Sequence, residues 1–364
     1  MTDITKLDKN FAVDTNIRTD DTDFYDVKEH LFCLYGLIHE DGCYRRLPRA
    51  VAESVSPAVA TLSRNTAGGR IRFMTDSPFV SIIASMPNLP PYNNISPTGS
   101  SSFDLFIDGL YSATFVYPRV TCDDKGYAAR KSIPRGTWEE AGVEIENGAT
   151  GMHEITIHFP LYHDVRDVSI GLKKGARFLP APAYRTGKRA ITYGSSITQG
   201  GCASVPGLAY SNILAMRHGI DLVNLGFSGN AKAEDAVCDY IIAQDPDIFI
   251  MDYDHNAPTL EHLQNTHERF FRRFRAAHPD TPVIMLSAPN YDVCPAWFEP
   301  RRQVVEATYE NALRDGDKNV YFIDGRTLFG IEHRDLCTVD ATHPNDIGFM
   351  RMADRISAVL EKLL

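Results

Sequence analysis

The second half of the chain alternates short apolar segments with longer amphipathic ones, and this alternation restricts the fold more than any other feature of the sequence. Strands are predicted at Ala190–Tyr193, Leu222–Leu225, Ile248–Asp252, Val283–Ser287 and Val320–Asp324. Helices are predicted at Leu208–Arg217, Ala233–Gln244, Leu260–Ala277, Arg301–Asp315 and Asn345–Leu363. Strands that alternate with helices form a parallel sheet covered on both faces. In such a sheet the ligand site lies at the carboxyl ends of the strands.

The first half is rich in short β-type segments separated by turn residues. Strands are predicted at Arg70–Met74, Phe79–Ala84, Phe103–Ile107, Ser112–Tyr117, Glu154–Phe159 and Val168–Leu172, with a short helical stretch near Ala50–Leu62. Many short strands with regular turns favour a β-sandwich, of jelly-roll type. The Pro- and Gly-containing segment Leu179–Lys188 is predicted to be a linker. We therefore expect two domains, residues 1–185 and 186–364.

Composition and charge exclude several classes of protein. The net charge of −10 argues against nucleic acid as a partner. No apolar run approaches the ~20 residues of a membrane helix, so we expect no membrane partner. The N-terminus lacks a basic start followed by an apolar stretch, which predicts no secretory signal and a cytoplasmic location. The seven cysteines are scattered without a CxxC pair, which argues against a disulfide framework or zinc module.

A serine-containing turn follows the first strand of the predicted parallel sheet. The segment Gly194–Gly200 reads GSSITQG and precedes a helix, so Ser195 or Ser196 would lie at the opening of the crevice. A serine there could act as a nucleophile, with its backbone N–H near developing negative charge. The alternative is a plain loop that caps the helix. The segment matches neither the G-x-S-x-G elbow nor a phosphate-binding loop.

A second polar segment lies between the last strand and the last helix, again on the carboxyl side of the sheet. It contains Asp340 and His343 in the order D-A-T-H. A histidine can remove the proton of a serine, and a carboxylate three residues earlier can fix the imidazole tautomer. The alternative for His343 is a residue at a helix start beside Pro344, and for Asp340 a turn carboxylate.

The loops after the second and third strands carry glycines and an asparagine. Gly229 and Asn256 offer a backbone N–H and a side-chain amide, the donors that an oxyanion needs. Gly229 could instead serve only an unusual backbone conformation. A metal site at Asp252, Asp254 and His255 is a further alternative, although no second cluster completes a coordination sphere. Nucleophile, oxyanion donors, acid and base would therefore converge from four loops.

With these residues in place, the sequence resembles the SGNH (GDSL-like) hydrolase superfamily over about residues 189–364. The resemblance assigns the nucleophile to Ser196, oxyanion donors to Ser196, Gly229 and Asn256, the base to His343 and the acid to Asp340. It implies a flavodoxin-like parallel sheet between helices, and neither a cofactor nor a metal. The usual acid before the nucleophile is replaced by Ser195, as in a branch that reads GSSITQG and carries an N-terminal β-sandwich. A G-x-D-L-Y-like segment of that sandwich is similar to Ser102–Phe106 here.

The resemblance predicts a serine esterase for small acyl esters, above all O-acetyl groups on carbohydrates, through an acyl-enzyme on Ser196. One alternative is an acyltransferase that uses the same residues to acylate a small alcohol. Another is a carbohydrate-binding β-sandwich joined to an inactive α/β domain. The sequence assigns no oligomeric state.

Several other residues have a structural and a functional interpretation. Cys202 is expected to be a buried packing thiol. Arg45 and Arg46 could contact a substrate, but a solvated pair in a turn is the commoner case. Aromatic residues near the predicted loop ends could stack on a sugar, although core packing is the commoner role of each: Tyr193, Phe227, Tyr253, Tyr291 and Trp297.

Overall fold

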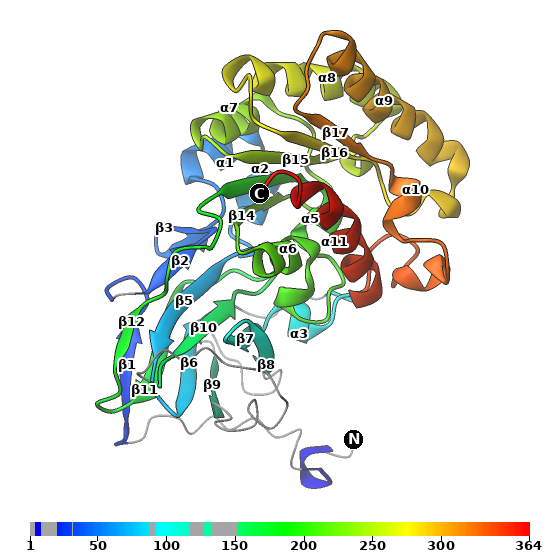
Figure 1. Ribbon diagram of the computed structural model, residues 1–364. Coiled ribbons are helices and arrows are strands. Elements are labelled where there is room, and N and C mark those ends of the chain that lie inside the picture. Colours follow the sequence, from blue (N-terminus) through cyan, green and yellow to red (C-terminus); the bar gives the residue numbers. More distant parts are fainter. Residues whose placement is uncertain (1–3, 9–19, 31, 88–91, 117–126, 133–150) are drawn as a thin grey trace.

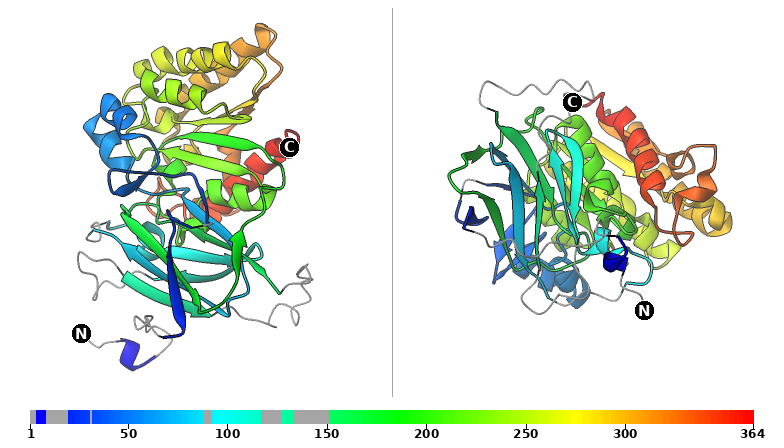
Figure 2. Two further views of the ribbon diagram at one scale, coloured as in Figure 1. Left: turned by 90° about the vertical axis from the view of Figure 1, so that its left-hand side faces the viewer. Right: turned by 90° about the horizontal axis from the view of Figure 1, so that it is seen from below.

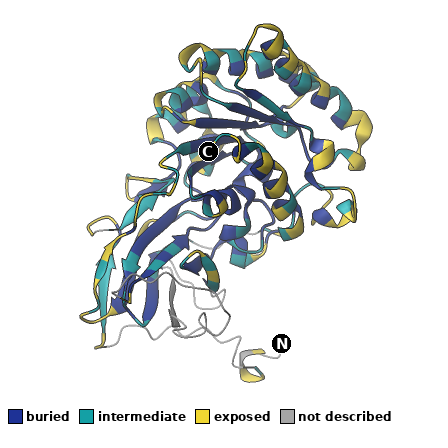
Figure 3. Cartoon of the chain, in the orientation of Figure 1, coloured by how far each residue is buried: buried dark blue, intermediate teal, exposed yellow. Residues whose placement is uncertain are grey.

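The computed structural model describes residues 4–8, 20–30, 32–87, 92–116, 127–132 and 151–364. A β-rich first half lies against an α/β second half, and the two share a long boundary (Figures 1 and 2). Most of the buried residues lie between the layers of each half (Figure 3). None of the helices in the described ranges has the length and hydrophobicity that a bilayer span requires.

The second half contains the expected parallel sheet. Its strands are β13 (Arg189–Gly194), β14 (Asp221–Gly226), β15 (Ile248–Asp252), β16 (Val283–Leu286) and β17 (Val320–Ile323). They pair in parallel in the order β14-β13-β15-β16-β17, which is the flavodoxin-like order. The chain reverses its direction of travel across the sheet at β13 and β15, so the carboxyl ends of these two strands form the switch point where ligands bind in such folds.

Helices cover both faces of this sheet. One face packs against α6 (Tyr210–His218) and α11 (Asp346–Leu360), and the other against α7 (Asp235–Ala243), α8 (Leu260–Ala277) and α9 (Pro295–Arg314). In α8 the residues Leu263, Phe270 and Phe274 recur at helical spacing and are buried. Short elements complete the loops: α5 (Ser196–Gln199), α10 (Gly325–Leu328), η3 (Pro206–Leu208), η4 (Asp254–Asn256), η5 (Tyr291–Val293) and η6 (Arg334–Cys337).

The first half is a sandwich of two antiparallel sheets, as predicted. One sheet has the order β1 (Thr22–Asp26), β11 (Asp167–Lys173), β6 (Phe79–Ser85), β9 (Tyr127–Ser132). The other has the order β12 (Phe178–Pro180), β5 (Arg70–Thr75), β10 (His153–His158), β7 (Phe103–Ile107), β8 (Leu110–Phe115), and β2 (Cys33–Tyr35) also pairs with β5. Ile71 and Ile157 from one sheet share a core with Ile82 and Ile170 from the other. The hairpin β3 (Ile38–Glu40)–β4 (Cys43–Arg45), η1 (Ile4–Lys6) and α3 (Pro97–Ser100) lie outside these sheets.

Three predicted segments differ from the structure. The helix predicted at Arg301–Asp315 begins earlier, at Pro295. The stretch Ala50–Leu62 forms two helices, α1 (Arg49–Val55) and α2 (Pro57–Leu62), because Pro57 has no N–H to continue the first helix and Ser56 caps the second. The predicted linker begins as strand β12, which pairs with β5. Tyr117, the last residue of one predicted strand, lies outside the described residues.

Helices α1 and α2 pack on the α/β half although they precede most of the β-sandwich in sequence. Ala52 and Val59 are fully buried in the same cluster as Phe227 and Val237 of the second half. In Figure 1 these two helices lie beside α7. Part of the first half therefore completes the core beneath the parallel sheet. The boundary between residues 185 and 186 stays a prediction.

Arg45 is 8% exposed and also buried, so the expectation of a solvated pair in a turn is wrong for both arginines, and Arg46 joins the two halves. Its side chain is 2% exposed and donates to the backbone carbonyls of Asn65 (2.6 Å) and Leu62 (2.7 Å) and, across the boundary, to Asn224 (3.5 Å) and Gly226. Burial lowers its pKa to about 9. Because its donors are used by backbone carbonyls, the guanidinium of Arg46 has a structural role and is not free to contact a substrate.

Candidate active site

The serine-containing turn Gly194–Gly200, which carries the predicted nucleophile, lies at the end of β13. Ser195 precedes the short helix α5, and its Oγ accepts a hydrogen bond from the N–H of Ile197 (3.1 Å). Gly194 is required by space, because a Cβ there would lie 2.1 Å from Thr198 Oγ1 and 2.3 Å from the carbonyl oxygen of Asp252. This geometry occupies the hydroxyl of Ser195 and leaves the hydroxyl of Ser196 for the crevice.

The second segment folds into a tight turn before α11. Asp340 Oδ1 accepts the backbone N–H groups of Thr342 (3.1 Å) and His343 (2.7 Å), and Ala341 between them has a left-handed φ of 64°. Asn345 then caps α11 by accepting the N–H of Gly348 (3.1 Å). The turn therefore fixes the carboxylate of Asp340 against the ring of the residue three positions later. We call residues 340–343 the Asp–His turn.

Ser196, His343 and Asp340 form one chain of hydrogen bonds. His343 Nε2 lies 3.0 Å from Ser196 Oγ, and His343 Nδ1 lies 2.8 Å from Asp340 Oδ2. Partial burial raises the pKa of Asp340, but hydrogen bonds from the backbone and ring of His343 and from Asn94 outweigh it and lower the pKa to about 2. An ionised Asp340 accepts the Nδ1 proton, which leaves the Nε2 lone pair directed at the serine hydroxyl.

Asn94, from the first half of the chain, contacts this chain of bonds and was not predicted. Its Nδ2 donates to Asp340 Oδ2 at 2.6 Å, and its carbonyl accepts the thiol of Cys202 at 3.4 Å. The segment after it is fixed by Ser96 Oγ, which donates to the carbonyl of Ser204 (3.3 Å), and by Gly99, where a Cβ would lie 1.9 Å from the carbonyl oxygen of Ala203. A contact between residues 246 positions apart leaves no local pattern in the sequence.

The loop after β14 and the end of β15 both contact the serine-containing segment Gly194–Gly200. Asn256 Oδ1 accepts the N–H of Ala231 (3.3 Å), which leaves the Nδ2 donors of that amide for a ligand. Gln199 of α5 accepts the N–H of Ser228 (3.1 Å), and Ser228 precedes the exposed Gly229. Gly229 has a φ of 67°, with open space where a Cβ would stand, so its backbone conformation explains the glycine. The oxyanion role of both residues stays a prediction.

The residues of the alternative metal site do not bring three ligand atoms together within the described part of the chain, although Asp254 Oδ1 and His255 Nδ1 are buried there without a hydrogen-bond partner. Asp252 Oδ2 accepts hydrogen bonds from Thr198 Oγ1 (2.7 Å) and Tyr210 OH (2.9 Å), and Asp254 Oδ2 accepts the N–H of Ala288 (3.0 Å). Burial, opposed by the hydroxyl donors and reinforced by the charge of Asp254, raises the pKa of Asp252 to about 7. Through its hydrogen bond with Thr198, the carboxyl of Asp252 holds the serine-containing turn in place.

The buried carboxyl of Asp252 should make stability depend on pH. Its pKa of about 7 in the fold exceeds the ordinary value of 3.8, so the folded protein holds the proton more tightly and loses stability as pH rises from about 4 to 7. We expect Asp252→Asn, which cannot ionise, to gain stability relative to wild type over this range, by at most about 1.4 kcal/mol per pH unit. Urea unfolding at pH 4, 5.5, 7 and 8 measures the difference. A difference that is constant with pH would contradict the assignment.

Cys202 is a buried thiol, as expected, and lies close to the Asp–His turn. Burial and the charge of Asp340 raise the pKa of Cys202 to about 12, so the thiolate that a nucleophile requires is disfavoured. Ligand atoms of Cys202, Asp340 and His343 lie within 4.8 Å of one another. Asp340 and His343 are already hydrogen-bonded to each other, and His343 to Ser196, so these hydrogen bonds account for their closeness without a metal ion.

The five aromatic candidates differ in exposure, and Tyr291 is half-buried with the guanidinium of Arg326 over its ring (6.0 Å). Tyr193, Phe227 and Tyr253 are at most 1% exposed and pack in the core. Trp297 is 39% exposed, and its ring centroid lies 5.7 Å from that of His255, the neighbour of Asn256. The guanidinium of Arg301 lies over one face of this ring, with its Cζ 3.9 Å from the centroid, so only the remainder of Trp297 is exposed near the candidate oxyanion donor.

Two family models match the sequence, one for each half. Residues 187–361 match the GDSL-like Lipase/Acylhydrolase family, and residues 22–178 match GxDLY, the N-terminus of Esterase_SGNH_hydro-type proteins. A search of curated proteins finds no match to this sequence.

Solved structures share the fold over both halves. A protein from Bacteroides ovatus ATCC 8483 named as a GDSL-like lipase superposes with a TM-score of 0.78 at 27% identity, covering 94% of this chain and 98% of the other. The salicylyl-acyltransferase SsfX3 from a tetracycline biosynthetic pathway gives 0.76 at 21% identity (95% and 98%). A family two carbohydrate esterase from Cellvibrio japonicus gives 0.60 at 14% identity (94% and 98%). The arrangement of a β-sandwich before the parallel sheet is therefore common to all four chains.

Proposed function

Since residues 187–361 belong to the GDSL-like lipase/acylhydrolase family, we propose that the protein hydrolyses small acyl esters by way of an acyl-enzyme on Ser196. The observation that carries this proposal is the chain of hydrogen bonds from Ser196 through His343 to Asp340. A serine hydroxyl needs such a base to become a nucleophile.

The reaction has two steps. His343 Nε2 takes the proton of Ser196 while Oγ attacks the ester carbonyl carbon, and Asp340 stabilises the imidazolium that forms. The C–O bond to the alcohol then breaks, and the imidazolium gives its proton to the departing oxygen. In the second step His343 removes a proton from water, which attacks the acyl carbon. The bond from that carbon to Ser196 Oγ then breaks, and the imidazolium returns its proton to Oγ as the acid is released.

The negative oxygen of each tetrahedral intermediate needs fixed donors. We assign this role to the backbone N–H groups of Ser196 and Gly229 and to the side-chain amide of Asn256. The engagement of Asn256 Oδ1 with Ala231 supports the assignment, because it orients the amide so that Nδ2 is left to donate.

O-acetyl groups on carbohydrates are the substrate class that we propose. The named activity of the carbohydrate esterases that share the fold supports this class. The exposed part of the Trp297 ring, one face of which carries Arg301, lies beside His255 and adds apolar surface that a sugar ring could contact. The fold is also that of a salicylyl-acyltransferase, so transfer of the acyl group to an alcohol is the second candidate.

A partition experiment tests the proposal. The enzyme is incubated with acetylated xylobiose or 4-nitrophenyl acetate, with and without a series of small alcohols, and free acetate is compared with acetylated alcohol. We expect acetate to dominate in every mixture and Ser196→Ala to produce neither product. Acyl transfer that exceeds hydrolysis at millimolar alcohol would favour the acyltransferase instead.

The contact from Asn94 should contribute to turnover. Its amide donates to a charged carboxylate, but both groups are exposed, so we expect Asn94→Ala to lower kcat by about tenfold at most, with KM unchanged. Loss of this donor should also move the pKa of Asp340 up from about 2 toward its ordinary value. Rate profiles from pH 3 to 8 measure both effects, and the exposed neighbour Asn93→Ala is the matched control. Equal profiles for the two variants would remove Asn94 from the site.

A further inference from the structure

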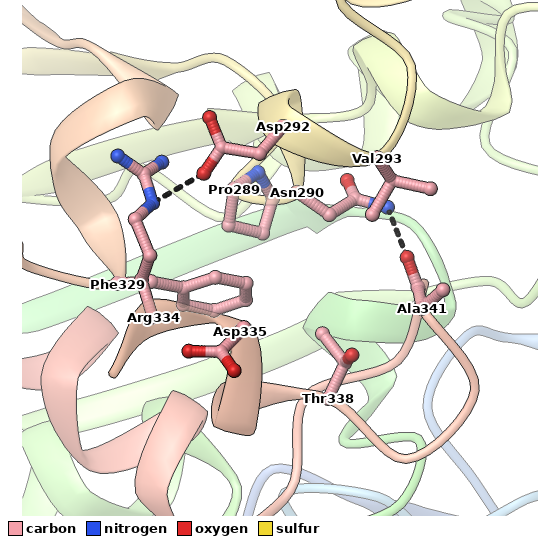
Figure 4. Close-up of a pocket in the computed structure, with 9 residues that line it drawn as sticks. All are labelled: Pro289, Asn290, Asp292, Val293, Phe329, Arg334, Asp335, Thr338 and Ala341. Carbon is pink, nitrogen blue, oxygen red and sulfur yellow. Dashed lines mark hydrogen bonds and ion pairs between the residues drawn. The ribbon is translucent and has the colours of Figure 1, made fainter. Parts of the chain in front are cut away.

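A pocket of about 430 Å³ lies against the Asp–His turn, and the proposed reaction does not use it (Figure 4). Its wall comes from the loop after β16, from the segment around η6, and from Ala341 of the turn itself. The lining residues are Pro289, Asn290, Asp292, Val293, Phe329, Arg334, Asp335, Thr338 and Ala341. Its volume falls in the range of about 300–1,000 Å³ that is usual for small-molecule sites.

Asn290 connects the pocket with the turn. Its side chain is 4% exposed, and its Nδ2 donates to the carbonyl of Ala341 at 3.1 Å. Its Oδ1 has no hydrogen-bond partner within the described ranges of the chain. A buried amide oxygen without a hydrogen bond is energetically unfavourable. A ligand O–H group could donate the hydrogen bond that Asn290 Oδ1 lacks.

The charges of the pocket disfavour an anionic ligand. Arg334 is paired with Asp292 through Nε at 2.5 Å, while its Nη2 has no hydrogen-bond partner within the described residues. Asp335 adds a second carboxylate, so the lining carries two negative charges against one positive charge. Phe329, Pro289 and Val293 supply apolar surface between these polar groups. Apolar faces combined with hydrogen-bond acceptors match a sugar ring, which presents C–H faces and hydroxyl donors.

We propose that this pocket binds a neutral sugar ring adjoining the acetylated one, with a hydroxyl that donates to Asn290 Oδ1. The inference rests on the proposed function and narrows its substrates from small esters to acetylated oligosaccharides. Because Ala341 follows Asp340 directly, a ring in this pocket lies beside the turn that holds the base. Because the lining offers hydrogen-bond acceptors that suit sugar hydroxyls, we assign the pocket to the alcohol part of the ester rather than to the acyl part.

The test compares a sugar ester with a small ester in the same variants. Val293 is 57% exposed at the pocket, so Val293→Trp should fill the space without disturbing the core. We expect Val293→Trp and Asn290→Ala to lower kcat/KM for acetylated xylobiose relative to 4-nitrophenyl acetate by about tenfold or more. Any damage to the Asp–His turn cancels in this ratio. The matched control is Leu313→Trp, an apolar position near the end of α9 that is 45% exposed and is not part of the pocket.

Other outcomes would overturn the inference or separate it from the proposed function. An unchanged ratio in both pocket variants would overturn it, as would a selective loss of activity on 4-nitrophenyl octanoate, which would assign the pocket to the acyl group. Unacetylated xylobiose should inhibit hydrolysis of 4-nitrophenyl acetate, and Val293→Trp should relieve that inhibition. If wild type cleaves no acetylated sugar but shows this inhibition, the pocket assignment stands and the carbohydrate-esterase proposal fails; absence of both defeats the pocket assignment.

Discussion

Ser196→Ala should reduce kcat for ester hydrolysis by roughly 10⁴–10⁶-fold while the protein remains folded. The substitution removes the atom that we propose forms the acyl-enzyme, and a methyl group fits where the hydroxyl lay, 3.0 Å from His343 Nε2. Initial rates with 4-nitrophenyl acetate measure the loss, and thermal unfolding checks that the fold is retained. A serine-directed organophosphorus probe should label wild type at Ser196 and leave the variant unmodified.

The adjacent serine provides the matched control. Ser195 Oγ caps α5 through the N–H of Ile197, so Ser195→Ala should cost about 1 kcal/mol of stability and retain most of the activity. The two variants make the same chemical change, loss of one serine hydroxyl, at adjacent positions. If Ser195→Ala were inactive and Ser196→Ala active, the roles of the two residues would be reversed and the mechanism above would be wrong.

Asp340→Asn should lower kcat by roughly 10³–10⁴-fold, an effect of the size known for the acid of a serine protease triad. The amide can turn its NH₂ toward His343 Nδ1, which then becomes the acceptor and moves the ring proton to Nε2. That proton would face Ser196 Oγ, and the ring could no longer accept from the serine. KM should change little, because Asp340 does not contact the ester.

The pH dependence provides an independent check on Asp340. A carboxyl whose pKa is about 2 keeps its charge above about pH 3, so the orienting bond is present at higher pH and is lost only as pH falls through about 2. The kcat of wild type should therefore show no inflection near pH 4 from titration of Asp340. Asp354→Asn, an exposed carboxylate on α11, is the control and should retain full activity. Equal activity of the two variants would exclude Asp340 as the acid.

The fold was predictable where apolar periodicity is strong and uninterrupted. All five strands of the parallel sheet appear within two residues of their predicted ends, because continuous apolar runs are needed when both faces are covered. Short edge strands such as β1 and β12 were missed, since three to five half-exposed residues carry little pattern. Prolines caused both errors in the helices: Pro57 divides one predicted helix, whereas α9 begins at Pro295 and continues through Pro300.

The site was predictable to the extent that its chemistry is carried by whole loops. Four loops at one edge of the sheet indicated Ser196, Gly229, Asn256 and the Asp–His turn, and the structure joins the serine to that turn by hydrogen bonds. Asn94 and Arg46 could not be found in this way, because each acts through a contact between the two halves. Arg46 in particular looks like a surface residue in the sequence, and its burial depends on carbonyls about 180 residues away.

The position of α1 and α2 has a consequence for how such a protein can evolve. These helices, encoded early in the gene, fill the core below a sheet that is encoded much later. The β-rich half therefore could not be exchanged between enzymes as an independent cassette, since a donor lacking matching apolar side chains would leave a hole under the parallel strands. Descendants of this architecture should inherit both halves together, and recombination within the chain should be tolerated only where partners on both sides are replaced at once.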